Sequence, residues 1–279
     1  MHELSGCNAI VTGASRGIGV YIARALAARG VNVALSARTR EPIEALAVEL
    51  RRTGVRAVAI ASDVALAADR ARLLELAETE LGAIDILVNN AALESNQAFV
   101  SFDPAYIEQM LQVDLTAPML LTRALLPGMI ARGRGHVVNV GSLAGKSATP
   151  YNVPYSAAKG GLILFTHSLR AELRGSGVSA SVIVPGFVSD VGMVADKVRA
   201  HGVTVPAIAG SSAPDKVARA VVRAIERDVL EIIVAHGPMR LSQAFNQLYP
   251  EAFAWFVQRI GAMDLFKKMA ETSRLEPPR

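Results

Sequence analysis

A glycine-rich turn between an apolar segment and a helix-forming segment restricts this chain more than any other feature. Residues 7–11 are apolar, residues 12–19 read TGASRGIG, and residues 20–29 have the apolar spacing of a helix. A strand, a glycine-rich turn and a helix in this order direct backbone N–H groups and a helix N-terminus towards one point, where they can hold a pyrophosphate. The spacing G-x-x-x-G-x-G differs from the common G-x-G-x-x-G pattern, so the turn indicates a nucleotide site only together with its flanking segments.

Strand-like and helix-like segments alternate along most of the 279 residues. Parallel strands joined through helices require right-handed crossovers, which cover both faces of the sheet. The pattern therefore predicts an α/β fold with a doubly wound parallel sheet in one large domain, residues 1–236. The seven predicted strands are residues 7–11, 31–36, 55–61, 84–88, 136–140, 178–184 and 230–234.

Residues 237–279 are predicted to form a C-terminal helical extension. They hold four of the eight phenylalanines and the only tryptophan, which indicates a segment with its own apolar faces. Packing on the core domain or on a neighbouring subunit is the simplest role for them. A substrate lid is an alternative, and so is a face lying on a membrane with help from Lys267 and Lys268. The prediction of helices rests on two groups of apolar residues at helical spacing. The first is Leu241, Phe245 and Leu248, and the second is Phe253, Phe256 and Ile260.

Charge and composition weigh against several classes of function. The net charge is +4, but the basic residues are scattered and not interleaved with aromatic ones, so an anionic small ligand is favoured over nucleic acid. The single cysteine, Cys7, excludes an internal disulfide, and the five histidines have no spacing typical of metal ligands, so we expect no metal site. Residues 1–7 lack the apolar core of a signal peptide, and we expect a soluble, cytoplasmic protein.

The end of the second predicted strand indicates which dinucleotide is preferred. Sites for NAD place a carboxylate there to bind the ribose 2′-hydroxyl, whereas an arginine suits a 2′-phosphate. No acid stands at Ser36 or Ala37, and Arg38 follows. We therefore predict NADP(H), with Arg38 as the main phosphate partner and Arg16 as a second, and NAD(H) as the less favoured cofactor. The alternative is that these arginines are simply solvated ahead of a helix.

Tyr155 and Lys159 are the strongest candidates for chemistry. They lie four residues apart in a helical segment, residues 150–174, so their side chains share one helix face. A nearby ammonium group favours the phenolate, so we expect the pKa of Tyr155 to be lowered from its usual value of about 10 towards neutrality. A surface tyrosine and lysine on an ordinary helix would look the same, and only their context distinguishes the two.

Polar residues and one proline add to this context. Asp63 and Asn90 stand at the carboxyl ends of predicted strands, where a doubly wound sheet binds its ligand. A long helix, residues 103–131, contains Pro118, which has no N–H to pair with the carbonyl of Asp114. We expect that carbonyl to bind an ordered water.

Six motifs in sequence order resemble the short-chain dehydrogenase/reductase family over roughly residues 5 to 236. The resemblance implies a Rossmann fold, NAD(P)(H)-dependent oxidation of an alcohol or reduction of a carbonyl, and a homodimer or homotetramer. The motifs are TGASRGIG at 12–19, DV at 63–64, NNAA at 89–92, GS at 141–142, YSAAK at 155–159 and PGFV at 185–188.

The resemblance also implies roles for individual residues. Tyr155 would be the general acid/base, Lys159 would hold the nicotinamide ribose and tune Tyr155, and Ser142 would hydrogen-bond to the reacting oxygen. Asp63 and Val64 would meet the adenine, Asn90 the adjoining ribose and Val188 the carboxamide. The phosphates and the rest of the cofactor would lie against Gly13, Ser15, Arg16, Gly17, Ile18, Gly19, Pro185 and Gly186.

Two positions depart from the family pattern. Asp114 aligns with an asparagine that belongs to a water relay to the lysine, and Asp190 aligns with a threonine that donates a hydroxyl hydrogen bond near the nicotinamide. The relay contribution resembles one made through the main-chain carbonyl, so Asp114 remains a candidate site residue, with an added charge near Lys159. A carboxylate cannot replace the threonine donor unless it is protonated.

These observations lead to three functional hypotheses. The first is an NADP(H)-dependent oxidoreductase for a hydrophobic ketone or secondary alcohol, with 3-oxoacyl thioesters as a narrower version and a pocket formed by Leu93, Tyr151, Phe187 and Met193. The second is a nucleotide-binding protein with little turnover that acts as a sensor or partner scaffold, which Asp114 and Asp190 would favour. The third is a protein that contacts a membrane surface peripherally.

Overall fold

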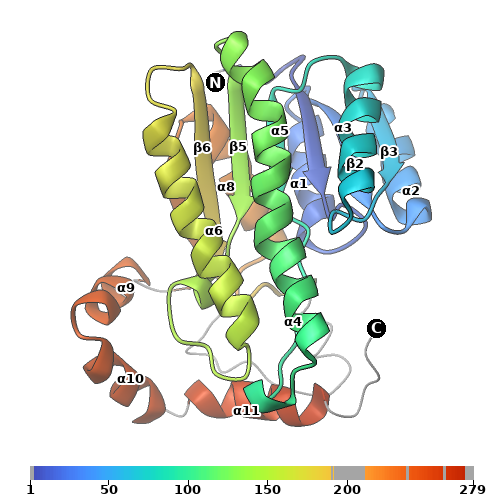
Figure 1. Ribbon diagram of the computed structural model, residues 1–279. Helices are drawn as coiled ribbons and strands as arrows, with labels where there is room; N and C mark the ends of the chain where they lie inside the picture. The colour runs from blue at the N-terminus through green and yellow to red at the C-terminus, as the bar shows by residue number, and fades with distance from the viewer. Residues whose placement is uncertain (1–2, 190, 192–210, 237–238, 260–261, 274–279) are drawn as a thin grey trace.

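The computed structural model has the predicted α/β architecture (Figure 1), and describes residues 3–189, 191, 211–236, 239–259 and 262–273. Its sheet has seven parallel strands in the order β3-β2-β1-β4-β5-β6-β7. The predicted strand ends are correct to within two residues. The strands are β1 Asn8–Thr12, β2 Asn32–Ala37, β3 Ala57–Ala61, β4 Ile86–Asn89, β5 Gly135–Val140, β6 Val178–Pro185 and β7 Glu231–Val234.

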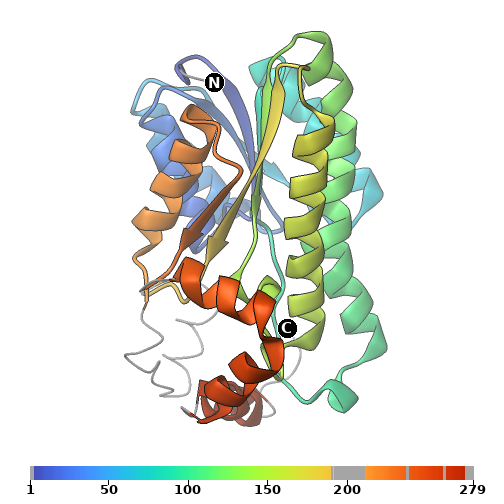
Figure 2. The same ribbon diagram turned by 90° about the vertical axis from the view of Figure 1, so that its left-hand side faces the viewer.

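Helices cover both faces of this sheet, as Figure 2 shows in side view. Helices α1 Ile18–Ala27, α2 Arg40–Arg51 and α8 Pro214–Glu226 cover one face. Helices α3 Ala67–Leu81, α5 Ala117–Ala131 and α6 Val153–Glu172 cover the other. Because successive side chains of a strand point to opposite faces, Val33 and Leu35 enter one core and Ala34 the other. This two-sided burial explains why the strands read as nearly continuous apolar runs.

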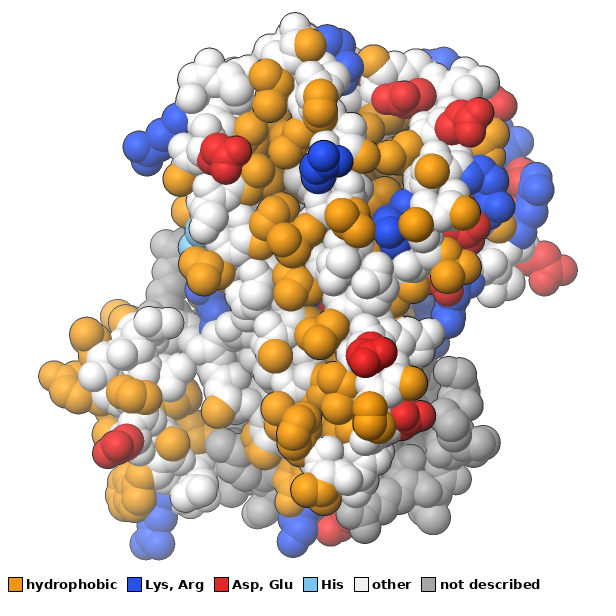
Figure 3. All heavy atoms as spheres, in the orientation of Figure 1, with side chains coloured by type: hydrophobic (Ala, Val, Ile, Leu, Met, Phe, Trp, Pro, Cys, Tyr) orange, Lys and Arg blue, Asp and Glu red, His pale blue; other side chains and the backbone are white. Residues whose placement is uncertain are grey.

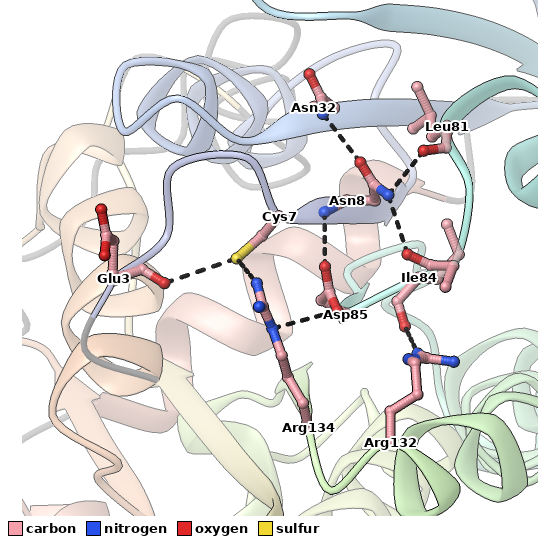
Figure 4. Close-up of polar contacts among 10 residues, drawn as sticks. Glu3, Cys7, Asn8, Asn32, Leu81, Ile84, Asp85, Arg132 and Arg134 are labelled. Carbon is pink, nitrogen blue, oxygen red and sulfur yellow. Dashed lines mark hydrogen bonds and ion pairs between the residues drawn. The ribbon is translucent and has the colours of Figure 1, made fainter.

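The strand order reverses between β1 and β4, and in such sheets a crevice forms outside the carboxyl ends of the strands at this point. At the amino ends of the strands, polar contacts join the neighbouring segments instead (Figure 4). There the amide nitrogen of Asn8 donates to the carbonyl of Leu81 at 2.8 Å, and Arg134 lies between the Cys7 thiol and Asp85. Cys7 is buried, as expected of a structural thiol.

The predicted long helix contains a local widening. Helix α4 Pro104–Leu111, capped by Asp103, continues into a π-helical turn at Gln112–Thr116 and then into α5. The N–H of Ala117 pairs with the carbonyl of Gln112, and Pro118 has no N–H to offer. By length and composition alone, residues 104–131 pass as a membrane span, but in this fold one face of α5 is buried against the sheet, which explains its apolar content.

The C-terminal extension is helical, as predicted. Helices α9 Met239–Leu248, α10 Pro250–Arg259 and α11 Ala262–Ser273 lie beyond the carboxyl ends of the strands, at the bottom of Figure 1. Two short 3₁₀ turns, η1 Phe99–Ser101 and η3 Leu143–Gly145, complete the fold. Of the residues singled out in the sequence, Asp190 and Met193 lie outside the described residues.

Candidate active site

A cavity of about 490 Å³ opens at the carboxyl ends of the strands and runs from the glycine-rich turn to the start of α6. It brings together residues from the loops after six different strands, β1 to β6. The cavity is lined by fifteen of the seventeen predicted site residues, namely Gly13, Ser15, Arg16, Gly17, Ile18, Arg38, Asp63, Val64, Asn90, Ser142, Tyr155, Lys159, Pro185, Gly186 and Val188. The other two, Gly19 and Asp114, do not line it.

The glycine-rich turn needs glycine for its backbone shape and for close packing. Gly13 and Gly17 have φ angles of 66° and 61°, and a Cβ on Gly13 would lie 2.8 Å from Cα of Ala91. The amide nitrogen of Asn90 donates to the carbonyls of Thr12 at 2.9 Å and Gly13 at 3.1 Å. Asn90 therefore joins the end of β4 to the turn, and its predicted contact with the ribose would have to use another atom.

Gly19 has a packing role in this structure beside its predicted role at the phosphates, which stays a prediction. It lies beneath the turn, where a Cβ would overlap the carbonyl of Gly13 and approach the Asn90 amide to 2.7 Å. Its role in this structure is to let α1 pack closely under the turn. Its neighbours Gly17 and Ile18, at the start of α1, line the cavity instead, where a helix N-terminus favours an anion.

The end of β2 carries no acid towards the cavity. Ser36 is buried and its hydroxyl pairs with that of Ser62 at 2.7 Å, and the exposed Arg38 follows. On the neighbouring strand end, Asp63 accepts a hydrogen bond from the N–H of Ala65 at 2.9 Å, which orders the loop that the adenine is predicted to meet. Arg38 thus lines the cavity after β2, at the place where the sequence predicts the partner of a 2′-phosphate.

Ser142, Tyr155 and Lys159 meet at the other end of the cavity. Tyr155 hydrogen-bonds to Ser142, and the Lys159 ammonium lies 5.5 Å from the centre of the Tyr155 ring. Lys159 is 2% exposed, and its Nζ donates to the carbonyl of Val140 at 3.2 Å. Because Ser142 follows β5 and the other two lie on α6, packing of this helix on the sheet assembles the group.

The predicted lowering of the Tyr155 pKa is wrong for this structure. Burial raises the pKa of Tyr155 well above its usual value, the carboxylates of Glu94 and Asp114 raise it further, and the Ser142 hydrogen bond only partly opposes them. Burial also lowers the pKa of Lys159, against the pull of Asp114 and Glu94. The i, i+4 spacing shows that an ammonium group is near the phenol, but it does not show that the phenol loses its water on folding. Tyr155 is therefore a protonated phenol at neutral pH.

Asp114 lies behind this group in the π-helical turn and is fully buried. Its Oδ1 accepts the N–H of Leu93 at 2.7 Å, and its Oδ2 has no hydrogen-bond partner within the described ranges. Burial raises the pKa of Asp114 to about 7, although Lys159 and the Leu93 N–H act in the opposite direction. Asp114 thus acts on the site through charge and position, without contact with the cavity.

Sequence reasoning missed several residues of the cavity. Glu94 lines it and accepts a hydrogen bond from the amide of Asn152, a second lining residue, at 2.8 Å. The only signal was their place just beyond a strand end and just before α6. Leu93 and Phe187 line the cavity as predicted, but Tyr151 is not among the lining residues, and Met193 lies outside the described ranges.

The packing of η3 on α6 leads to a prediction about Gly145. A Cβ at this position would lie 2.5 Å from the carbonyl carbon of Lys159 and 2.6 Å from the nitrogen of Gly160. We expect Gly145→Ala to lower the free energy of unfolding by about 2 to 3 kcal/mol, because neither backbone segment can move aside cheaply. Thermal and denaturant unfolding would measure the loss.

Gly128→Ala is the matched control for that substitution. Gly128 lies inside α5, where the added methyl would meet only the flexible end of Arg132 at 3.2 Å, so stability should stay constant or rise slightly. Equal stability of the two variants would contradict the close packing of η3 on α6.

A doubly wound sheet, a glycine-rich turn and a Ser–Tyr–Lys group on one cavity define an NAD(P)-dependent oxidoreductase with a Rossmann fold. The chain belongs to the short chain dehydrogenase family, whose pattern matches residues 7–205. It is an oxidoreductase of the kind that interconverts ketones and CH–OH groups.

Relatives and solved structures agree with this assignment. A protein named ketoacyl reductase HetN, from a Nostoc species, is 40% identical over 276 residues, which cover 97% of this chain and 95% of that protein. The structure of an actinorhodin polyketide ketoreductase with NADPH has a TM-score of 0.77 and 30% identity, and covers 84% of this chain and 98% of its own. A metagenomic short-chain oxidoreductase in complex with NADP has a TM-score of 0.70 and 34% identity, over 82% and 97% of the two chains.

Proposed function

We propose that this protein uses NADPH to reduce the ketone of an apolar substrate, with 3-oxoacyl thioesters as the favoured class. The observation that carries the proposal is the hydrogen-bonded pair of Ser142 and Tyr155, which faces a largely apolar cavity beside the glycine-rich turn. Two hydroxyl groups at one point suit an oxygen that gains negative charge during reduction.

The residues of the site divide the work. Bound NADPH supplies the hydride. The hydroxyls of Ser142 and Tyr155 hold the carbonyl oxygen of the substrate, and Tyr155 then gives it a proton. Burial raises the pKa of Tyr155, so the phenol is suited to donate a proton to the oxygen of a substrate that is being reduced. Lys159 would hold the ribose, and its ammonium would stabilise the phenolate that Tyr155 becomes when its proton leaves.

The residues present fit a dinucleotide with a 2′-phosphate. Gly13 and Gly17 line the cavity with positive φ angles and no side chain between their backbone and a pyrophosphate, and the start of α1 lines the same place. Arg38 and Arg16 line the end of the cavity where no carboxylate follows β2. The similar short-chain oxidoreductase that carries NADP and the similar polyketide ketoreductase that carries NADPH add support for this preference over NAD(H).

The preference for NADPH is tested by Arg38→Ala. We expect NADPH binding to weaken about tenfold, because one charge-assisted contact to the 2′-phosphate is lost, while NADH binding stays the same. Fluorescence titration of both nucleotides measures this.

The matched control for Arg38→Ala is Arg40→Ala. Arg40 stands two residues further on, forms an exposed pair with Glu44 at 3.8 Å and does not line the cavity. An Arg38→Ala variant that binds both nucleotides as the unchanged protein does would refute the phosphate contact.

The proposed reaction is tested by following the oxidation of NADPH with a panel of 3-oxoacyl thioesters and hydrophobic ketones. Turnover of a thioester, with the 3-hydroxyacyl product identified by mass, is the expected result. Tight binding of NADPH with no turnover of any panel member would instead favour a nucleotide-binding sensor or scaffold. Failure to bind either nucleotide would reject both readings.

A further inference from the structure

The C-terminal extension contributes side chains to the cavity that contains Tyr155. Phe253 and Val257, one turn apart on α10, and Phe266 on α11 line it. The i, i+4 spacing places the first two on one face of α10. These residues lie far beyond residues 7–205, which match the family pattern. The extension is therefore part of the site as well as a packing element.

Aromatic packing holds these side chains in place. The ring of Phe266 stacks on that of Phe187, with centres 6.2 Å apart and planes at 30°, and Met269 packs against both with 1% exposure. Phe187 follows the end of β6, so it joins α11 to the sheet. Phe253 meets the edge of Phe245 on α9, with ring centres 6.2 Å apart. Both helices that reach the cavity, α10 and α11, thus present apolar side chains to it that are held by aromatic contacts.

Hydrogen bonds attach the extension beside the reacting group. The amide of Gln243 on α9 donates to the hydroxyl of Ser147 at 2.8 Å, and that of Asn246 donates to the carbonyl of Lys146 at 3.0 Å. Both acceptors lie just after η3, and Ser147 itself lines the cavity. This attachment places the apolar side chains on the same cavity as Ser142.

We infer that Phe253, Val257 and Phe266, together with Phe187, form the wall that binds the hydrocarbon chain of the substrate and sets its preferred length. The identity of the reacting group rests on the proposed function, but the wall does not. None of the four side chains carries a charge or a hydrogen-bonding group, so they suit an alkyl chain and not a sugar or an anion. Apolar burial scales with area, which predicts about fourfold tighter binding for each added methylene until the wall is covered.

Two aromatic residues of α10 that lie outside the cavity supply matched controls. Trp255 and Phe256 are 65% and 49% exposed and do not line the cavity. Apolar side chains also gather on the outside of α9 and α10, at the lower left of Figure 3. Phe256→Ala thus removes the same ring as Phe253→Ala, from the same helix, without changing the wall.

The test uses straight-chain acyl N-acetylcysteamine thioesters that lack the 3-oxo group and therefore cannot be reduced. Their binding to the full-length protein with NADPH is measured by calorimetry as a function of chain length. We expect Phe253→Ala and Phe266→Ala to weaken binding of the longest thioesters about tenfold and to leave the shortest ones unchanged. Phe256→Ala should behave as the unchanged protein does.

Val257→Phe tests the same wall without removing packing. A larger side chain on this face should shorten the longest chain that binds, and thermal unfolding would verify that the variant is folded. The inference is overturned if chain-length dependence is the same in the unchanged protein, Phe253→Ala and Val257→Phe. Chain-length-dependent binding of these thioesters without reduction of the 3-oxo analogues would reject the proposed reaction and leave the wall standing. Reduction of the 3-oxo analogues without any dependence of binding on chain length would reject the wall and leave the proposed reaction standing.

Discussion

Replacing Tyr155 by phenylalanine is expected to lower turnover by about a thousandfold or more, while NADPH binding changes less than about twofold. The substitution removes one hydroxyl from a buried ring that hydrogen-bonds to Ser142, and leaves the ring in its packing against Phe102 and Met110. The reaction then loses both its proton donor and one of two hydrogen bonds to the developing negative charge. Steady-state NADPH oxidation with the best thioester of the panel, next to a nucleotide titration, measures the two effects.

Tyr151→Phe is the control for that result. Tyr151 stands one turn before Tyr155 in sequence but does not line the cavity, so removing its hydroxyl should leave turnover nearly constant. If Tyr155→Phe kept a tenth or more of the turnover, the assignment of Tyr155 as proton donor would be wrong.

Replacing Asp114 by asparagine is expected to change how stability depends on pH. Burial raises the pKa of Asp114 from 3.8 to about 7 in the folded protein, so the folded state holds this proton more tightly than the unfolded state does. Stability from this group is therefore complete below pH 3.8 and is lost as the pH rises through about 7. Asparagine does not titrate, so Asp114→Asn should gain on the unchanged protein by on the order of 3 kcal/mol between pH 5 and pH 8.

Denaturant unfolding of both proteins across this pH range measures the difference. Asp103→Asn is the control, because Asp103 is the exposed cap of α4 and asparagine caps a helix equally well. Parallel stability curves for Asp114→Asn and the unchanged protein would contradict a buried, proton-holding Asp114. In Asp114→Asn, and not in Asp103→Asn, turnover should lose an inflection near pH 7, because the charge that Asp114 places near Lys159 no longer varies.

Much of the fold and several residues of the candidate site could be predicted from local sequence patterns. The glycine-rich turn, the alternation of strands and helices and the absence of an acid after β2 are properties of short stretches, and the structure has all of them. Tyr155 and Lys159 share a helix face because a helix repeats every 3.6 residues, whatever surrounds it. Patterns of this kind depend on neighbours in sequence, and so they survive into the folded protein.

Other properties of the site arise only when distant segments meet. The direction of the Tyr155 pKa depends on burial and on Glu94 and Asp114, which reach it from other elements. Gly19 is required for close packing as well, because the start of α1 lies against the carbonyl of Gly13 and the amide of Asn90. The sequence placed Phe253 and Phe256 on one apolar face, yet only Phe253 lines the cavity.

The sequence by itself determined the class of fold and predicted the parts of the Ser–Tyr–Lys group and the place of the nucleotide, since each of these follows from residues close together in the chain. Only the tertiary structure decided which groups lose water, which carboxylates lie near Tyr155, and which side of α10 lines the cavity. The physical reason is that desolvation and the Coulomb interaction depend on distances in space, and these are set by the packing of segments far apart in sequence.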